Sequence, residues 1–513
     1  MILTTSPTVL ILLGSTTLYL LYTRLALYLR RRAFKKQHNC QPSFYTYNKD
    51  PILGLDVLQE SLRHVKTRTL LPAQRNRFLS QNTRTFRSRQ VDSPIIATIE
   101  PENMKTILSL RFKDYSLGHR QRAFYPLLGD GIFNSDGEKW ANSRHLLRPN
   151  FAREQVADLE ALERHFKLLL QHIPGDAATF DLQKLFFRYT LDTATEFLFN
   201  HSTNSLRVLG DDSQSAEAAF AKAFTRASDD ILAQIRAGAL HWFRRGRKER
   251  REAVRICHEY VERFADEAIS WRRDRDAGKI EEKGNERYVF IRELAKQTTD
   301  RTVLRDELIN ILLAGRDTTA GLLSNMFFMI ATRPRIWEKI REEVKFLGGR
   351  PPSYDELRNL KYVKYCLNEG LRLFPAVPGN MRLAVRDTVL PLGGGKDQKS
   401  PLFVAKGTAV GYSPFAMHRR EDFYGADAEE FRPERWETLR VGWEYLPFNG
   451  GPRICLGQQY ALTEASFVTV RLAQMFKAVE SRDTNGGVWV EGLGLTLCSG
   501  NGTLVGLVAD ETA

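Results

Sequence analysis

The residues from about 150 to 345 carry a helical pattern almost throughout, and this pattern narrows the possible folds more than any other feature. Acidic and basic side chains recur there at i, i+3 and i+4, which is typical of helices with a solvent-facing side. No stretch rich in Pro, Gly or Ser divides the chain. Shorter strand-like segments lie outside this region, at residues 83–101, 380–412 and 485–508. The sequence therefore predicts one mainly α domain with small β-sheets.

The composition is that of an ordinary globular protein, with 42% hydrophobic and 27% charged residues among 513. It excludes a disordered, collagen-like or multi-spanning membrane chain. The formal net charge is +14, but half of it comes from residues 1–49, which contain seven basic residues and no acid. The rest of the chain is only mildly basic and shows no basic stripe with interleaved aromatic residues. We therefore expect no nucleic-acid partner.

The N-terminal residues 1–23 contain no charged side chain and include two apolar runs. Together with residues 24–29 they are long enough for a spanning helix of about 20 residues, since Arg24 can extend its charge to the interface. The basic block Arg30–Lys36 follows and predicts a short lumenal N-terminus with a cytosolic body. The alternative is an amphipathic helix on the membrane surface. We expect a single transmembrane segment at residues 1–29, a linker at 30–51 and the functional domain at 52–513.

Five cysteines are scattered without a CxxC or framework spacing, which is typical of a reducing compartment. One of them, Cys455, lies in the Gly- and Pro-rich segment 447–457, and helical sequence begins directly after it. The helix dipole, free backbone N–H groups and Arg453 would stabilise a thiolate there. Cys455 is therefore expected to be a ligand or a nucleophile, but a nucleophile needs a base and the loop contains none. The other four cysteines are expected to be inert core residues.

The residues Phe448, Gly451, Arg453, Cys455 and Gly457 form a pattern that resembles the haem-binding signature of the cytochrome P450 family. Other segments are similar to further hallmarks of that family, in its order and spacing: Trp140–Arg144, Ala314–Thr319, Glu369–Arg372 and Phe431–Trp436. The resemblance covers roughly residues 45–510. It implies the cytochrome P450 fold and a haem-thiolate monooxygenase, an oxidoreductase that activates dioxygen and inserts one oxygen atom into a hydrophobic substrate.

The resemblance also implies roles for single residues. Cys455 would be the axial thiolate ligand of the iron in haem b (iron protoporphyrin IX), within a loop shaped by Phe448, Gly451 and Gly457. The buried haem carboxylates need compensating partners, and these would be Trp140, Arg144, Arg382 and Arg453. Ala314 and Gly315 would leave room for dioxygen, and Asp317 and Thr318 would deliver protons. Glu369, Arg372 and Arg435 would form a structural ion-pair network.

Three further segments carry a weaker resemblance to fungal microsomal enzymes that ω-hydroxylate n-alkanes and long-chain fatty acids. They are residues 49–56, 304–319 and 377–382. This resemblance implies a location at the endoplasmic reticulum membrane. A hydrophobic substrate also suits the apolar residues at the expected substrate-contacting positions, namely Leu312, Leu313, Ala376, Val377 and Leu495. The alternative is an oxidation step on a terpenoid or polyketide in a fungal specialised-metabolite pathway.

The sequence contains no flavodoxin-like or dinucleotide-binding segment, because Gly393–Gly395 lacks the strand–GxGxxG–helix context. The resemblance therefore implies that electrons come from NADPH through a separate NADPH–cytochrome P450 reductase, with cytochrome b5 as an optional second donor. A non-catalytic haem- or lipid-binding membrane protein is an alternative of another class, and a haem-thiolate isomerase or dehydratase is a further one. Neither would need the pair Asp317 and Thr318.

Overall fold

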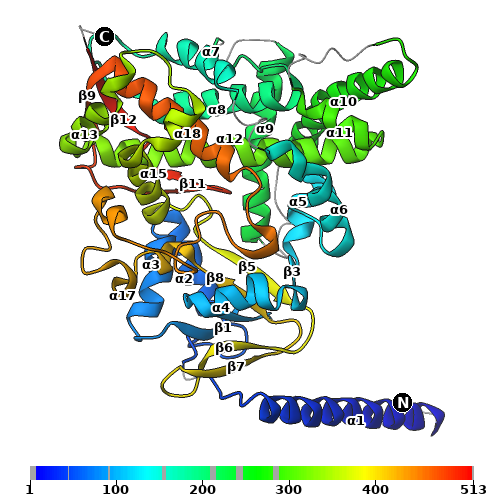
Figure 1. Ribbon diagram of the computed structural model, residues 1–513. Helices are drawn as coiled ribbons and strands as arrows, with labels where there is room; N and C mark the ends of the chain where they lie inside the picture. Colours follow the sequence, from blue (N-terminus) through cyan, green and yellow to red (C-terminus); the bar gives the residue numbers. More distant parts are fainter. Residues whose placement is uncertain are drawn as a thin grey trace. The chain divides into compact units, whose positions relative to one another are not determined.

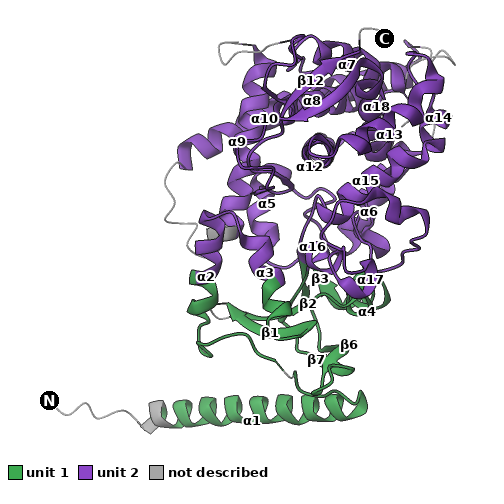
Figure 2. Ribbon diagram, turned by 90° about the vertical axis from the view of Figure 1, so that its left-hand side faces the viewer, with its two compact units in different colours: residues 1–59, 76–116, 381–412 green, residues 60–75, 117–380, 413–513 purple. Residues whose placement is uncertain are grey.

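The computed structural model describes residues 7–43, 45–90, 93–152, 158–207, 215–237, 247–280 and 288–510 (Figure 1). The chain forms two compact units, each built from three separate segments (Figure 2). Unit 1 comprises residues 1–59, 76–116 and 381–412, and unit 2 comprises residues 60–75, 117–380 and 413–513. The domain expected at residues 52–513 is thus divided. No linker marks the division in the sequence, because the chain passes repeatedly between the units.

Unit 2 is mainly helical, as predicted. Its helices up to the centre of the chain are α5 (Arg120–Leu128), α6 (Gly137–Leu147), α7 (Leu159–Leu170), α8 (Leu182–Phe199), α9 (Ala216–Ala237), α10 (Arg247–Asp276), α11 (Phe290–Gln297) and α12 (Arg301–Ala331). The later ones are α13 (Pro334–Val344), α14 (Tyr354–Asn359), α15 (Lys361–Leu373), α16 (Pro414–Met417), α17 (Glu421–Tyr424) and α18 (Gln458–Met475). The chain passes between the units within α2 (Leu55–Lys66) and α3 (Leu70–Leu79).

Helix α12 runs through the middle of unit 2, where Figure 2 shows it end-on. Asp300 caps its N-terminus by accepting hydrogen bonds from the N–H groups of Thr302 and Val303. Its side chains are buried on almost all sides, which is typical of a core helix rather than a surface helix. One apolar cluster joins α12 to α13, α15 and α18, and a second joins it to α5, α9 and α10.

Unit 1 contains two sheets, which confirms the strands predicted within residues 83–101 and 380–412. The larger sheet has the order β1-β2-β8-β5-β3, from β1 (Thr85–Gln90), β2 (Ser93–Thr98), β3 (Tyr115–Ser116), β5 (Asn380–Ala384) and β8 (Ala409–Tyr412). β1 and β2 form an antiparallel hairpin, while β2 and β8 pair in parallel with Ile96 opposite Val410. The second sheet is the antiparallel pair β6 (Thr388–Gly394) and β7 (Ser400–Val404). α4 (Pro101–Lys105) follows β2 in the chain.

The strands of unit 2 form two smaller sheets. In one, β12 (Leu504–Ala509) pairs antiparallel with both β9 (Phe476–Ser481) and β4 (Phe180–Asp181). The other is the antiparallel pair β10 (Glu491–Leu493) and β11 (Leu497–Ser499). The strand-like pattern at residues 485–508 is therefore confirmed. β4 lies inside the region predicted to be helical, because its pairing partner β12 comes from the far end of the chain.

The prediction of a transmembrane segment at residues 1–29 is corrected by the structure. Helix α1 (Pro7–Gln37) is 31 residues long, and residues 1–6 lie outside the described residues. Among the helices that the structure describes, none combines the length and apolarity needed to cross a membrane. The physical reason is that Gly14, Ser15–Thr17, Thr23 and Arg24 interrupt the apolar side chains of α1.

The basic residues after the apolar part of α1 bind unit 1 rather than stand free. α1 continues to Gln37, well into the segment predicted as a linker. The Arg31 guanidinium pairs with Asp387, with 3.1 Å between Nε and Oδ2, and the Lys35 ammonium lies 4.9 Å from the centre of the Phe403 ring. Further on, the N–H of Gln41 donates to the carbonyl of Pro401 at 2.8 Å. The expected linker is thus held against the β6–β7 hairpin.

Candidate active site

The loop at residues 447–457 presents the cysteine directly before α18. Asn449 and Gly451 have φ angles of 62° and 67°, so this loop contains no α-helix, as predicted, although Gly451–Arg453 form a single short 3-10 turn. Inside the loop the N–H of Cys455 donates to the carbonyl of Phe448 at 3.0 Å. Gly457 is the N-cap residue of α18. The cysteine therefore stands where a helix presents free backbone N–H groups.

All five cysteines lie in the described residues, and only Cys455 has an exposed side chain. Desolvation by the surrounding protein raises the pKa of this thiol, while the N–H of Gly457 and the charge of Arg144 act in the opposite direction. Arg144 is anchored to the same loop, because its Nη1 donates to the carbonyl of Ile454 at 3.1 Å. Arg144 is therefore a cation bound to this loop that lies near the thiol, in addition to Arg453, which is adjacent to the cysteine in sequence.

Arg453 is bound to the connection between α5 and α6. Its Nη2 donates to the carbonyl of Ser135 and to Oδ1 of Asp136, both at 2.8 Å. Its guanidinium carbon lies 4.5 Å from the centre of the Trp140 ring on α6, so the structure brings two predicted site residues together. The sequence analysis missed Asp136. An Asp directly before a helix normally caps it, but this carboxylate makes no cap hydrogen bond and pairs with Arg453.

Ala314, Gly315 and Thr318 form a half-exposed part of α12, although the helix is buried before and after them. The Thr318 hydroxyl donates to the carbonyl of Ala314 at 2.7 Å, so its oxygen remains able to accept a hydrogen bond. A Cβ at Gly315 would lie 3.4 Å from the Cβ of Ala194 on α8. Of the two small residues expected to leave room for dioxygen, Gly315 therefore turns its open side toward α8.

Asp317 is 9% exposed, and its Oδ1 has no hydrogen bond within the described residues. The Arg316 guanidinium lies 3.5 Å from that oxygen and is held by donation to the Thr225 hydroxyl on α9 at 2.8 Å. Desolvation raises the pKa of the Asp317 carboxyl, Arg316 lowers it, and Asp229 on α9 raises it again. A buried carboxyl with a raised pKa is protonated more readily than an exposed one, which suits a group that holds and releases a proton.

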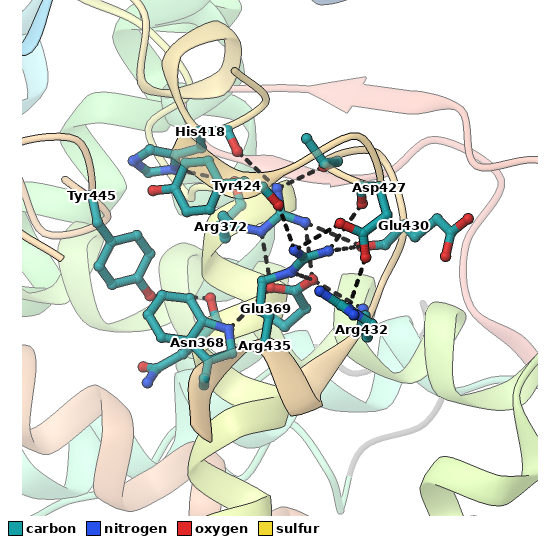
Figure 3. A network of polar contacts seen from close by, with 12 residues as sticks. Asn368, Glu369, Arg372, His418, Tyr424, Asp427, Glu430, Arg432, Arg435 and Tyr445 are labelled. Atoms are coloured by element: carbon teal, nitrogen blue, oxygen red, sulfur yellow. Dashed lines mark hydrogen bonds and ion pairs between the residues drawn. The ribbon is translucent and has the colours of Figure 1, made fainter. Parts of the chain in front are cut away.

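The three residues expected to form a structural network are brought together in unit 2 (Figure 3). Glu369 and Arg372 on α15 are fully buried, and the Arg372 Nε and Nη2 atoms each donate to a Glu369 oxygen at 2.9 Å. Arg435 lies in the short helix η6 (Pro433–Glu437) and donates from Nε to the same carboxylate at 2.8 Å. The Trp436 indole adds a fourth donor at 3.0 Å. The carboxylate thus joins α15 to η6.

His418 connects this network to the cysteine loop, a role that the sequence analysis missed because a lone histidine gives no local signal. Its Nε2 accepts from the N–H of Leu446 at 2.8 Å, so that Nδ1 is left to donate to the carbonyl of Arg372, 3.1 Å away. Burial lowers the pKa of His418 to about 3, which keeps the ring neutral. Leu446 directly precedes the loop at residues 447–457, so the neutral histidine fixes the start of that loop.

Arg382 lies in β5 and is buried, with 4% exposure. Its Nη1 donates to the carbonyl of Met381 at 2.8 Å, and its guanidinium carbon lies 6.0 Å from the centre of the Tyr412 ring. These residues belong to unit 1. The structure therefore describes Arg382 apart from the site residues of unit 2.

The chain is similar to known proteins over most of its length. The family model described as Cytochrome P450 matches residues 71–488. The chain is 49% identical to Cytochrome P450 monooxygenase himC of Aspergillus japonicus over 481 residues, which is 93% of this chain and 85% of the relative. It is 46% identical to Cytochrome P450 monooxygenase fsdH of Fusarium heterosporum over 497 residues (94% and 86%) and to Cytochrome P450 52A12 of Debaryomyces hansenii over 452 residues (85% and 86%). The chain belongs to the cytochrome P450 family of monooxygenases, which are oxidoreductases.

Family membership implies a haem-thiolate cofactor, and the described residues fit it. Cys455 offers an exposed sulfur at a helix N-terminus, which is the donor that such a haem requires. Arg453 belongs to this loop and Arg144 is hydrogen-bonded to it, and cations there can compensate the haem carboxylates. The half-exposed Ala314 and Thr318 show where α12 is open. The mainly helical architecture with small sheets is the cytochrome P450 fold.

Proposed function

We propose that Cys455 supplies the axial thiolate ligand of haem b, in a loop shaped by Phe448, Gly451 and Gly457. The main support for this proposal is that Cys455 is the one exposed cysteine and lies directly before α18. When bound, the haem supplies the oxidising chemistry, and the protein supplies binding, orientation and electrostatics. The N–H of Gly457 and the Arg144 charge favour the anionic sulfur.

The haem carboxylates are held in this proposal by Arg144, Arg453, Trp140 and Arg382. Arg453 suits this role because it is already fixed on one side by Asp136 and on its face by Trp140. A guanidinium that is held in one plane keeps its remaining N–H groups in a fixed fork. Arg382 is buried with its Nη1 on a backbone carbonyl, so it is also presented in a defined orientation.

Proton delivery is assigned to Asp317 and Thr318, and the space for dioxygen to Ala314 and Gly315. The Asp317 carboxyl is desolvated and lies near the charges of Arg316 and Asp229. In this proposal it takes up a proton and holds it in a site with little water. Thr318 can accept a hydrogen bond while it donates to Ala314.

The substrate proposed is a long aliphatic chain, an n-alkane or a fatty acid hydroxylated at or near its end. Three apolar residues at the expected substrate positions, Leu312, Leu313 and Leu495, belong to or pack on one apolar cluster. Ala376 is buried as well, and its carbonyl accepts from the N–H of Leu497 at 3.0 Å. The apolar character of these positions is what a hydrophobic substrate requires. Oxidation of a terpenoid or polyketide is the second candidate, since himC and fsdH match the chain as closely as 52A12 does.

The proposed location is the cytosolic side of the endoplasmic reticulum membrane, with electrons from NADPH through a separate reductase and optionally through cytochrome b5. Association with the membrane is supported by α1, on which Ile11, Leu12 and Leu13 are 60–68% exposed and Leu18 is 72% exposed. Exposed apolar side chains that are grouped on one helix are typical of protein or membrane contacts. On the cytosolic side, the sequons at Asn200 and Asn501 stay unglycosylated, which a glycosidase mobility assay measures.

The first experiment is a reduced carbon-monoxide difference spectrum of microsomes, followed by titration with dodecanoic acid and hexadecane. A red-shifted thiolate band together with a substrate-induced spin shift supports both the ligand and the aliphatic substrate. The band without a shift keeps the monooxygenase and favours the specialised-metabolite candidate. In Cys455→Ala the band should vanish, whereas the matched variant Cys498→Ala should keep it. Retained turnover in Cys455→Ala would overturn the ligand assignment.

A further inference from the structure

The N-terminal half of α12 carries a polar face that the proposed roles do not use. Asp306, Glu307 and Asn310 lie one to two helical turns before Ala314. The three residues are between 0% and 4% exposed, although burying such groups is costly unless they are hydrogen-bonded. All three are bonded to the connection between α5 and α6, at residues 129–136.

The bonds run mainly from the N–H groups of this connection to the side chains of α12. They are Asp130 N–H to Asp306 Oδ2 (2.9 Å), Ile132 N–H to Glu307 Oε2 (3.1 Å), Phe133 N–H to Asn310 Oδ1 (2.9 Å) and Asn310 Nδ2 to the Leu128 carbonyl (2.9 Å). Each of the three side chains thus satisfies a different backbone group. The connection is therefore hydrogen-bonded to α12 at several residues rather than at one.

The approach of the connection to α12 is so close that two glycines are required. A Cβ at Gly129 would lie 1.9 Å from Asp306 Oδ2, and a Cβ at Gly131 would lie 2.2 Å from Asn310 Nδ2. Gly129 also has a φ of +54°, which favours glycine. Gly131 has no positive φ, so its requirement is steric alone. The polar face of α12 and the two glycines therefore fit each other.

The second half of the same connection holds Arg453. Asn134 donates to the carbonyl of Gly129 at 2.8 Å, and the Ser135 hydroxyl donates to the carbonyl of Gly131 at 3.0 Å. The connection is thereby folded back on itself. Its last two residues, Ser135 and Asp136, accept the hydrogen bonds of Arg453. A continuous set of hydrogen bonds therefore leads from α12 to the arginine of the cysteine loop.

We propose that Asp306, Glu307 and Asn310 form a clamp that positions Arg453 for the haem carboxylate. The inference rests on the proposed role of Arg453, and the three clamp residues act through the connection at residues 129–136 rather than on the haem itself. The Nη2 atom of Arg453 is hydrogen-bonded to the connection, and the face of its guanidinium lies against Trp140. Because the guanidinium is planar and rigid, a shift of the connection turns the whole group. The clamp also links two hallmarks of the site, because the same helix carries Asp317 and Thr318.

The test compares Asn310→Ala with the matched control Asn325→Ala. Both asparagines are fully buried on α12, and Asn325 also donates to a backbone carbonyl, that of Leu497, and accepts from the Trp489 indole. The readout is the rate at which the holoenzyme releases haem to excess apomyoglobin, with the urea midpoint measured in parallel. Asn310→Ala is expected to release haem about tenfold faster. The control should lose comparable stability without faster release, and equal release rates in the two variants would overturn the clamp.

A double-mutant cycle separates the clamp from the proposed role of Arg453. Arg453→Ala should itself speed haem release, and Asn310→Ala should then add nothing in that background. Independent, additive effects would show that the clamp does not act through Arg453. If Arg453→Ala leaves release unchanged, the proposed role of Arg453 and the clamp fail together. If only Arg453→Ala has an effect, the clamp fails and the proposed function stands.

A steric variant tests the same contact without removing a hydrogen-bonding group. Gly131→Ala places a methyl group against Asn310, which is held by its hydrogen bonds to Phe133 and Leu128 and cannot move without breaking them. Faster haem release is expected in Gly131→Ala alone. In the background of Asn310→Ala the methyl group has space, so the second substitution should no longer change the rate. A persistent effect in that background would argue that Gly131 acts elsewhere.

Discussion

Replacing Glu369 by glutamine removes the charge that holds the network of Figure 3 together. The carboxylate accepts five hydrogen bonds: two from Arg372 and one each from Arg435, the indole of Trp436 and the N–H of Arg432. Its side chain and that of Arg372 are 0% exposed. Removing one partner of such a buried pair leaves a charge uncompensated and costs about 3–5 kcal/mol. That is a large share of the roughly 5–15 kcal/mol by which domains are stable.

The loss should not be larger, because the two guanidinium groups keep other partners. Arg372 still donates to the carbonyls of His418 and Ala428 at 2.8 and 2.7 Å. Arg435 keeps the Asp427 carboxylate at 3.3 Å and the Tyr424 carbonyl at 2.8 Å. We therefore expect Glu369→Gln to lower the free energy of unfolding by about 4 kcal/mol.

Urea unfolding followed by far-UV circular dichroism measures this loss. The matched control is Glu480→Gln, which breaks an exposed pair with Arg482 whose side chains are 44% and 38% exposed. Breaking that pair should lower the free energy of unfolding by about 1 kcal/mol or less. Should Glu369→Gln prove too unstable to purify, Trp436→Phe removes a single donor to the same carboxylate and should cost about 2 kcal/mol. A Glu369→Gln loss no greater than that of Glu480→Gln would refute the reasoning.

Three further predictions concern the pH dependence of stability and the supply of protons. The folded-state pKa of His418 is about 3, below its ordinary 6.5, so only the unfolded chain takes up this proton between pH 6.5 and 5. Stability should therefore fall by about 2 kcal/mol over that interval, and urea titrations of His418→Gln should show a correspondingly smaller fall; an identical slope would contradict it. Thr318→Ala should keep the thiolate spectrum but divert NADPH electrons to hydrogen peroxide, and unchanged coupling would remove Thr318 from the mechanism. Asp317→Asn should lower turnover at constant substrate affinity, because the raised pKa of its carboxyl serves proton transfer; a change in affinity alone would point to a binding role.

The cysteine loop shows how far local sequence can predict a site. Glycine and proline at fixed spacing exclude a helix over residues 447–457, and the helical pattern after Cys455 predicts the start of α18. Both statements depend only on neighbouring residues. The start of α18 is confirmed, and the loop contains no α-helix but does contain a short 3-10 turn at Gly451–Arg453. The same holds for Trp140 and Arg144, which share the predicted helix α6, and for Glu369 and Arg372 on α15.

The partners of these residues could not be predicted in the same way. Proximity in sequence favoured Arg453 as the cation beside the thiol, and it could not predict that Arg144 is also hydrogen-bonded to this loop or that Arg453 pairs with Asp136. His418 joins Arg372 to Leu446 from a segment that carries no local signal. The apolar run near the N-terminus lies in the helix α1. It also led to the prediction of a transmembrane segment, which the described residues do not support.

The sequence by itself determined the helical class, the strand segments, the thiol-bearing loop and the family to which the chain belongs. These are properties of local patterns, since periodicity and glycine positions act over a few residues. Only the tertiary structure decided which distant groups meet: Asp306, Glu307 and Asn310 with the connection before α6, and that connection with Arg453. The physical reason is that a buried polar group must find a hydrogen-bond partner wherever the packed chain offers one. That choice is made by the fold as a whole and not by the residue's neighbours in sequence.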